Sequence, residues 1–447
     1  MLNLTKGNPM KLILAFSIPL LFGNIFQLFY NLADTRIVGE TLGDVAIGAL
    51  GATSSINSVI IGFLNGLTSG FALIVARYFG AEDYNKMRNA VATTITLGLF
   101  TSAILTILSL VFLDDILVLL NTPAEIFNQS KSYIQVILAG MTISMMYNVC
   151  AGILRAIGDT VRPLIFLIVA VIINIGLDYL FILGFNMGVS GAAYATLISQ
   201  AISVILCVIY ILKKYKILIP KKENFKLRKK LVVEMYATGI SMGFMISIVS
   251  LGSVALQGSI NKFGTKTIVA HTAARKISET FMLPISVFGA AGATFSSQNL
   301  GAGEIGRVKK GVVSSTLITW IWSLLVMIIC YAFTPFLVKL VTGTSNPYVV
   351  STVWKYMKIN TPFYFILGII IVFRNSLQGL GDKLTPIISS IIELVGKVIV
   401  VKFLAPALGY LGIMISEPLV WVFMALTLII SFARNKTLKT RAQEQGT

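Results

Sequence analysis

Residues 154–163 read LRAIGDTVRP, and residues 377–386 read LQGLGDKLTP. Both stretches fit the pattern L-x-x-[IL]-G-D-x-x-x-P and start 223 residues apart. A second pair of motifs, YFGAED at 78–83 and NLGAGE at 299–304, repeats as G-A-x-[DE] at an offset of 221 residues. Two pairs with nearly equal offsets indicate that the chain consists of two similar halves. We interpret the Gly-Asp motifs as turns, because Gly permits a turn, Asp can cap the next helix and Pro suits its first turn.

The sequence around these motifs is strongly apolar. Of the 447 residues, 56% are hydrophobic and 12% are charged, whereas soluble domains carry about 25% charge. Strict apolar/polar alternation is absent, which argues against an outer-membrane barrel. We therefore predict an all-α integral membrane protein with twelve transmembrane helices in two six-helix bundles. The predicted spans are 12–35, 45–76, 89–113, 127–152, 163–184, 189–212, 232–258, 268–297, 311–335, 350–377, 386–406 and 408–433.

The repeat also predicts the domain organisation. An even number of spans in each half gives both halves the same orientation, so an axis along the membrane normal should relate them. We predict an N-terminal six-helix lobe over 1–212 and a C-terminal six-helix lobe over 231–447, which ends in a short basic tail. The basic stretch 213–230, KKYKILIPKKENFKLRKK, is predicted to be a cytoplasmic linker next to anionic lipid.

The net charge is +18, and the distribution of the Lys and Arg residues along the chain indicates whether a membrane or a nucleic acid accounts for it. If the N-terminus is cytoplasmic, 24 of the 36 Lys and Arg residues fall on that side of the predicted spans. This bias is the positive-inside rule and not a nucleic-acid footprint. We expect a multi-pass protein of the inner (plasma) membrane with both termini cytoplasmic. No signal peptide should be removed, because the first span lacks a small-residue cleavage site.

The residue inventory discourages most enzyme classes. His271 is the only histidine, and the three cysteines lie within apolar runs without disulfide or metal spacing. A P-loop is also absent, so a nucleotide motor would need another subunit. We expect a protein that is not an enzyme and has no cofactor.

Charges within predicted spans mark ion or substrate paths by default. The in-span charges are Asp34, Asp178, Glu279, Glu393, Glu417, Arg275, Lys276, Arg374 and Lys397. At ~1.5 Å per residue, Asp34 and Asp178 both lie roughly 8–10 Å below the outer face. Asn174 lies one helical turn from Asp178, and Tyr133 and Thr196 lie at nearly the same depth.

We therefore predict a cation-coupling site in the first lobe, formed by Asp34, Tyr133, Asn174, Asp178 and Thr196. Oxygen ligands of this kind suit Na⁺ or a proton, and Na⁺ would be held by Asp34, Asn174, Asp178 and Thr196. The alternative is a polar network that only holds helices together.

The second half differs at the equivalent positions. Lys397 corresponds to Asn174, and Val401 corresponds to Asp178. We interpret Glu393 with Lys397, and Arg275 with Glu279, as intrahelical i,i+4 ion pairs, with a substrate role as the alternative. Candidate residues for the substrate cavity are Glu279, Glu417, Met141 and Met145, since Glu417 could pair with a cationic substrate and Met adapts to many ligand shapes.

The order of these motifs resembles the multidrug and toxic compound extrusion (MATE) transporters. The resemblance rests on the twelve spans, the FYNLADTRIVG run at 29–39, the G-A-x-[DE] loops and the doubled Gly-Asp turn. It implies a V-shaped pair of bundles, alternating access, and export of organic cations against H⁺ or Na⁺. It is closer to the DinF-type branch, in which coupling is placed in the N-terminal lobe. The acids of the NorM-type branch correspond to Ser247 and Gln378 here, so a sodium site in the second lobe is not expected.

The predicted function is thus a secondary active multidrug efflux antiporter. Its partners would be small organic, mostly cationic and hydrophobic compounds, the coupling ion and the lipid bilayer, and we expect it to act as a monomer. A flippase for a lipid-linked precursor is one alternative, since Arg275, Arg374 and Lys397 could face a pyrophosphate. An integral-membrane enzyme is the other alternative.

Overall fold

The computed structural model describes residues 2–435, 437 and 438, without the side chains of 250, 251 and 253–255. Within this part no β-strand occurs, and all twelve predicted apolar segments are helical, which confirms the all-α fold class. The predicted basic tail lies largely outside the described residues, because Lys436, Lys439 and Arg441 are not among them.

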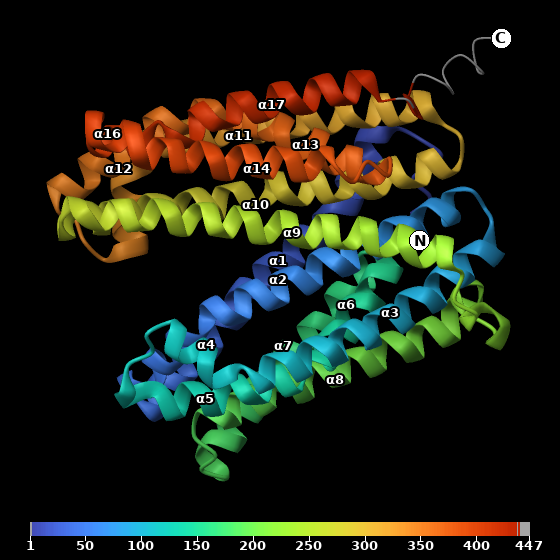
Figure 1. Ribbon diagram of the computed structural model, residues 1–447, viewed down its shortest axis with the longest axis horizontal. Coiled ribbons are helices and arrows are strands. Elements are labelled where there is room, and N and C mark those ends of the chain that lie inside the picture. The colour runs from blue at the N-terminus through green and yellow to red at the C-terminus, as the bar shows by residue number, and fades with distance from the viewer. Residues whose placement is uncertain (1, 436, 439–447) are drawn as a thin grey trace. The chain divides into compact units, whose positions relative to one another are not determined.

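Tertiary contacts divide the chain into two compact units. The first unit comprises Met1–Asn3 and Ile18–Gly243, and the second unit comprises Leu4–Ser17 and Phe244–Thr447. The helices α1 and α9 therefore each contribute to both units. The elements up to α9, shown in blue to yellow-green in Figure 1, are α1 (Pro9–Leu42), α2 (Asp44–Gly80), α3 (Tyr84–Val111), α4 (Leu113–Leu119), α5 (Ala124–Ala139), α6 (Met141–Ala156), α7 (Val161–Tyr179), η1 (Leu180–Gly184), α8 (Val189–Lys214), η2 (Lys216–Leu218), η3 (Lys222–Phe225) and α9 (Lys229–Ile260).

The second unit continues with one long helix pair and a series of broken helices. Its α10 packs along both α11 and α13. The elements after α9 are η4 (Asn261–Phe263), α10 (Thr265–Gly301), α11 (Ile305–Thr342), α12 (Pro347–Asn360), η5 (Thr361–Phe363), α13 (Tyr364–Gly379), α14 (Thr385–Ile399), η6 (Val400–Leu404), α15 (Ala405–Leu408), α16 (Tyr410–Met414) and α17 (Ser416–Arg434).

Most of these helices are long and apolar enough to cross a membrane. Among the described residues, ten helices pass this test, and the pair α5 and α6, bent by 47°, adds an eleventh candidate span. The remaining predicted segment, 386–406, consists of α14, the π-helical turn η6 and the start of α15. It carries the ionisable residues Glu393 and Lys397 in its middle.

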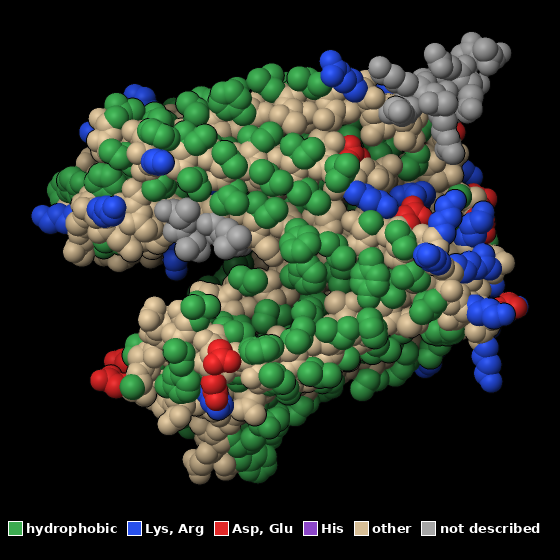
Figure 2. Space-filling view, in the orientation of Figure 1, with side chains coloured by type: hydrophobic (Ala, Val, Ile, Leu, Met, Phe, Trp, Pro, Cys, Tyr) green, Lys and Arg blue, Asp and Glu red, His purple; other side chains and the backbone are tan. Residues whose placement is uncertain are grey.

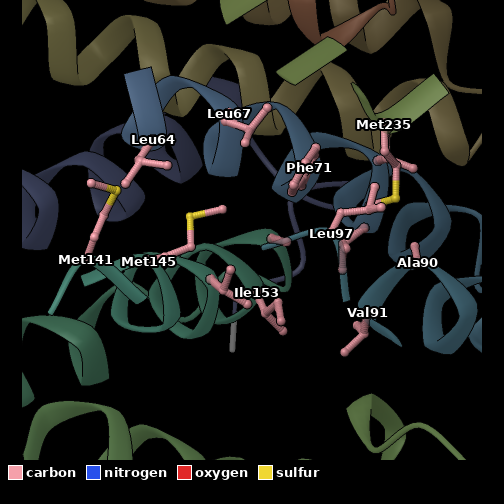
Figure 3. Packing of buried hydrophobic residues seen from close by; sticks show 14 of the residues in the cluster. Leu64, Leu67, Phe71, Ala90, Val91, Leu97, Met141, Met145, Ile153 and Met235 are labelled. Atoms are coloured by element: carbon pink, nitrogen blue, oxygen red, sulfur yellow. The ribbon is translucent and has the colours of Figure 1, made fainter. Parts of the chain in front are cut away.

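The hydrophobic core of the first unit lies between α2, α3 and α6. Figure 3 shows side chains of α2, α3 and α6 converging, among them Leu67, Phe71, Leu97 and Met145. Phe71 and Met145 are completely buried, as is Leu67. Helix α6 also packs on α8.

Both Gly-Asp motifs form the predicted turns. Gly158 and Gly381 have φ angles of 84° and 87°, a backbone conformation that favours glycine. Asp159 accepts a hydrogen bond from the backbone N–H of Arg162 at 3.2 Å, and Asp382 accepts one from Thr385 at 3.0 Å. The carboxylates therefore cap α7 and α14, which accounts for these motifs structurally.

Helices α2 and α9 approach each other closely within the first unit. A Cβ atom at Gly70 would lie 2.5 Å from the Cα atom of Gly239, and one at Gly66 would lie 2.7 Å from that of Gly243. Such distances exclude any side chain larger than hydrogen without movement of the backbone. Gly66 and Gly70 therefore form a packing surface on α2, and small residues commonly have this role in membrane helices.

Charge separates toward the two ends of the first unit. In Figure 2, Lys and Arg side chains gather at the end where the linker lies, with a few Asp and Glu among them, whereas Asp and Glu predominate at the end near α4. The linker is docked on α3, because Arg88 donates to the carbonyl oxygen of Ile217 at 3.1 Å and Asn224 donates to Asn89 at 2.7 Å. The predicted linker is thus packed against the helix ends.

Candidate functional site

The first unit brings together the five residues predicted to bind a cation. They come from four helices: Asp34 from α1, Tyr133 from α5, Asn174 and Asp178 from α7, and Thr196 from α8. On α7 the buried positions Ala170, Asn174 and Asp178 follow at four-residue intervals, so one face of this helix points into the unit. Asn174 and Asp178 are fully buried, and Asp34 is 8% exposed.

Hydrogen bonds connect members of this group. In the amide orientation that satisfies both of its polar atoms, Asn174 donates to Asp178 Oδ2 at 3.1 Å and accepts from the backbone N–H of Thr196 at 3.2 Å. The Thr196 hydroxyl lies 2.9 Å from the hydroxyl of Tyr30. Tyr133 interacts electrostatically with both Asp34 and Asp178. The five residues that share one predicted depth are therefore neighbours in space.

Tyr30 is a member of this group that sequence reasoning missed. It interacts with Asp34, Asp178 and Tyr133 as well as with Thr196. Its signal in the sequence is the spacing of four residues to Asp34, which places both side chains on one face of α1.

The two carboxyl groups are the chemically important feature of the cluster. Asp34 and Asp178 interact with each other, and no Lys or Arg is among the groups that act on either of them in the described part of the chain. Oδ1 of each carboxyl group is buried without a hydrogen-bond partner among the described residues. A buried carboxylate oxygen is costly unless a proton or cation accompanies it, so this pair is suited to bind one.

The cluster opens into a cavity of ≈510 Å³ within the first unit. One stripe of α1 lines it at intervals of three or four residues, from Pro19 through Gly23, Gln27 and Tyr30 to Asp34. Most of the other lining side chains are also polar; they include Asn24, Asn31, Asn57, Asn65, Ser69, Tyr133, Ser144, Tyr147, Asn148, Arg155, Thr160, Thr196 and Gln200.

Helix α6 explains why two predicted cavity residues lie elsewhere. Met141 and Met145 are completely buried in the hydrophobic core, where they point toward α2 and α3 (Figure 3). The cavity is lined instead by the other face of α6, at Ser144, Tyr147 and Arg155 among others. Methionines at helical spacing thus serve core packing here, and polar residues on another face of α6 line the cavity.

The second unit holds a different polar cluster. Arg275 forms ion pairs with Glu417 and, at 3.1 Å, with Glu279, which is the predicted i,i+4 partner. Tyr356 donates to Glu417 at 3.3 Å, and His271 Nδ1 lies 3.1 Å from the hydroxyl of Tyr410. These residues, except Tyr410, line a second cavity of ≈310 Å³. Glu417 therefore already has a cationic partner, which the sequence did not indicate.

Three further charges are buried where the second half repeats the first. Lys397 donates to Glu393 at 2.8 Å, as the i,i+4 spacing predicted. Arg374 lies 3.9 Å from the same carboxylate. Since Lys397 stands at the position of Asn174, the second unit carries a built-in ammonium group where the first has an amide.

Comparison with known proteins identifies the family. The MatE family model matches the chain twice, over residues 19–180 and 241–404. The chain is 28% identical over 404 residues to the probable multidrug resistance protein YpnP of Bacillus subtilis, which covers 88% of this chain and 87% of that protein. It is 26% identical over 399 residues to the probable multidrug resistance protein NorM of Thermotoga maritima, with coverage of 86% and 83%.

Solved structures show the same fold. A crystal structure of MATE in the bent conformation superposes with a TM-score of 0.90 at 24% identity and covers 99% of both chains. An outward-facing multidrug resistance MATE family transporter of the MOP superfamily gives a TM-score of 0.87 at 24% identity, with coverage of 97% and 98%. Because the family model matches both halves and most of the length, the chain belongs to the MatE family of multidrug efflux transporters and is a multi-pass membrane transporter.

Proposed function

We propose that the protein is a secondary active antiporter that exports organic, mostly cationic and hydrophobic compounds in exchange for H⁺ or Na⁺ by alternating access. The observation that carries this proposal is the buried pair Asp34 and Asp178, whose Oδ1 atoms have no hydrogen-bond partner among the described residues. Asn174, Thr196, Tyr30 and Tyr133 surround the pair with neutral oxygen and amide groups. The proposal therefore places the coupling of ion and cargo movement in the first unit, as in the DinF-type branch.

Antiport requires that the ion and the cargo favour opposite states of the carrier. The carboxyl pair can provide this bias because its net charge changes when a proton or Na⁺ binds. The cavity that contains Asp34 also contains the residues that would meet the cargo, so both ligands act on one unit. The ion-loaded and cargo-loaded forms then differ in charge within a single cavity.

The remaining parts of the proposal concern setting and partners. The bias of Lys and Arg residues supports a plasma-membrane protein with both termini in the cytoplasm. We expect the transporter to act as a monomer, because the carboxyl pair and its cavity lie within one unit of one chain. It should need no cofactor besides the coupling ion.

The test is efflux of a fluorescent organic cation from proteoliposomes under imposed pH or Na⁺ gradients, each applied separately. Asn in place of Asp keeps the shape and hydrogen-bonding capacity but not the charge. We expect Asp34→Asn and Asp178→Asn each to reduce gradient-driven efflux to the level of protein-free vesicles. The double variant should be no worse than either single one, because both residues serve one site.

Glu40→Gln is the matched control. Glu40 lies on the same helix, but its side chain is 56% exposed and paired with Arg36. Its replacement should leave efflux unchanged. Normal gradient-dependent efflux by monodisperse Asp34→Asn would refute the coupling role and leave a polar network that only holds helices together. The coupling role would also be refuted if Asp34→Asn gave no monodisperse protein while Asp178→Asn remained active in gradient-driven efflux.

A further inference from the structure

The cavity of the first unit contains one arginine that the proposed coupling reaction does not use. Arg155 lies in the last turn of α6 and lines the cavity together with Ser144, Tyr147, Asn148 and Ala151. These positions recur at intervals of three or four residues, so they form one stripe on α6 that faces the cavity. Arg155 therefore belongs to the cavity wall.

Arg155 differs from the other arginines of the helical interior in its partners. Arg77, Arg275 and Arg374 each have a glutamate partner. The side chain of Arg155 has no ion pair and no hydrogen bond within the described part of the chain. Among the described residues, the titratable groups that act on it are the phenol of Tyr147 and the thiol of Cys207. Its charge is therefore available to a ligand in the cavity.

The distance to the carboxyl pair is too large for that pair to neutralise Arg155. Thr160 lines the same cavity and immediately precedes α7, which carries Asp178 near its other end. The 18 residues between them correspond to roughly 27 Å along a helix. Arg155 precedes Thr160 by five residues, so it lies at the Thr160 end of the cavity. The cavity is thus acidic at one end and basic at the other.

The wall between these ends carries groups that can form hydrogen bonds with a cargo. Seven amide side chains line the cavity: Asn24, Gln27, Asn31, Asn57, Asn65, Asn148 and Gln200. Among the described residues, the side chains of Gln27, Asn57 and Asn65 have no hydrogen-bond partner within the protein. A cavity built only for hydrophobic cations would need neither these amides nor an arginine, since ligand pockets are mostly apolar with few polar groups.

We propose that Arg155 is a cargo-binding residue, and that the first-unit cavity prefers organic cations that also carry a carboxylate or phosphate group. The anionic group of such a zwitterion would be bound by the guanidinium fork, which matches the geometry of these oxyanions. The amides would bind the polar groups along its length. This inference rests on the proposed antiport function only for the direction in which the cargo is transported. The preference of the cavity for zwitterionic cargo does not depend on antiport.

The sharpest test uses two dyes that differ at one group. Rhodamine 110 carries a free carboxylate, and rhodamine 123 is its methyl ester and purely cationic. Fluorescence anisotropy measures the affinity of the purified full-length protein for each dye in detergent, without any ion gradient. We expect the protein to bind the free acid about tenfold more tightly than the ester, as one charge-assisted interaction permits.

Arg155→Gln should remove this preference. Gln is chosen because the equivalent position of the second half is Gln378. The affinity for rhodamine 110 should fall about tenfold, while that for rhodamine 123 should stay within about twofold. Arg155→Lys should keep most of the preference because it keeps the charge. The control is Arg162→Gln: Arg162 lies over the ring of Tyr210, 5.3 Å from its centroid, and does not line the cavity.

Three results would overturn the proposal. The first is equal affinity of the wild-type protein for both dyes. The second is an equal loss of affinity for both dyes in Arg155→Gln, which would indicate a structural role. The third is displacement of rhodamine 110 by phosphatidylglycerol but not by inorganic phosphate or free glutamate, which would assign Arg155 to a lipid headgroup.

The same variants separate this inference from the antiport proposal. Gradient-driven efflux of rhodamine 123 without any preference for the free acid would uphold antiport and refute the role of Arg155. Preferential binding of rhodamine 110 that depends on Arg155, without gradient-driven efflux, would uphold the binding site and refute antiport.

Discussion

The buried charges of the second unit allow a prediction about stability. Glu393 is the only carboxylate that contacts Arg374 and Lys397 among the described residues, and all three side chains are at most 10% exposed. The group therefore carries one excess positive charge. Glu393→Gln removes the one carboxylate that contacts these cations among the described residues, whereas Lys397→Met leaves the pair of Arg374 and Glu393.

The size of the effect follows from this charge count. Removing one partner of a buried ion pair costs about 3–5 kcal/mol, because the other charge stays buried without compensation. Replacing Lys397 by an apolar residue of similar length should cost no more than about 1 kcal/mol, since Arg374 still neutralises Glu393. For units of 150–250 residues, 1 kcal/mol corresponds to about 2–4 °C in Tm. Glu393→Gln should thus melt roughly 6–20 °C below the wild type.

The assay is thermal unfolding of purified protein in detergent, followed by intrinsic fluorescence at one fixed scan rate. Glu279→Gln is the matched control: Glu279 also pairs with an arginine, but its side chain is 62% exposed and Arg275 keeps Glu417. This variant should melt within about 4 °C of the wild type. Lys397→Met should also retain its dependence on the driving ion in proteoliposomes, because coupling is assigned to the first unit.

Two results would refute this reasoning. If Glu393→Gln melts like the wild type, the carboxylate does not compensate the two cations. If Lys397→Met is as unstable as Glu393→Gln, the excess charge is not the cause of the difference between the two variants.

Further predictions concern packing, topology and a helix cap. Gly70→Ala should destabilise the protein by about 1–3 kcal/mol in thermal unfolding, because the added Cβ collides with α9. The control is Gly176→Ala, which should leave the stability unchanged because a Cβ there meets nothing within 4 Å. Cysteines introduced into 213–230 should react with an impermeant thiol reagent only from the cytoplasm, and one at Asp115 only from outside; labelling of both from one side would contradict the topology. Asp83 caps α3 at Lys86 N–H, and the Lys86 side chain holds the pKa of Asp83 below its usual value. Asp83→Ala should cost about 1 kcal/mol at pH 7. Because the lowered pKa makes this contribution present above about pH 4 and lost as the pH falls, wild type and variant should converge in melting temperature in acid.

The sequence alone determined the fold class and the position of each polar residue along its helix. Apolar segments separated by charges and turns are sufficient to predict spans, because a bilayer requires about 20 apolar residues for each helix. Depth follows from position at ~1.5 Å per residue, so the order of residues along the chain is enough to group Asp34, Asp178 and their neighbours at one level. The pair Glu393 and Lys397 followed equally from local spacing, since side chains four residues apart lie on one helix face.

Only the tertiary structure decided which face of each helix meets which neighbour. Met141 and Met145 lie at a suitable depth for a cavity, yet they face the core, and Arg155 faces the cavity on the other side of α6. Glu417 is paired with Arg275, 142 residues away in the sequence. The physical reason is that depth depends on the position of a residue along one helix. The direction of a side chain toward a partner depends instead on how helices distant in sequence rotate and pack against each other, which local spacing does not encode.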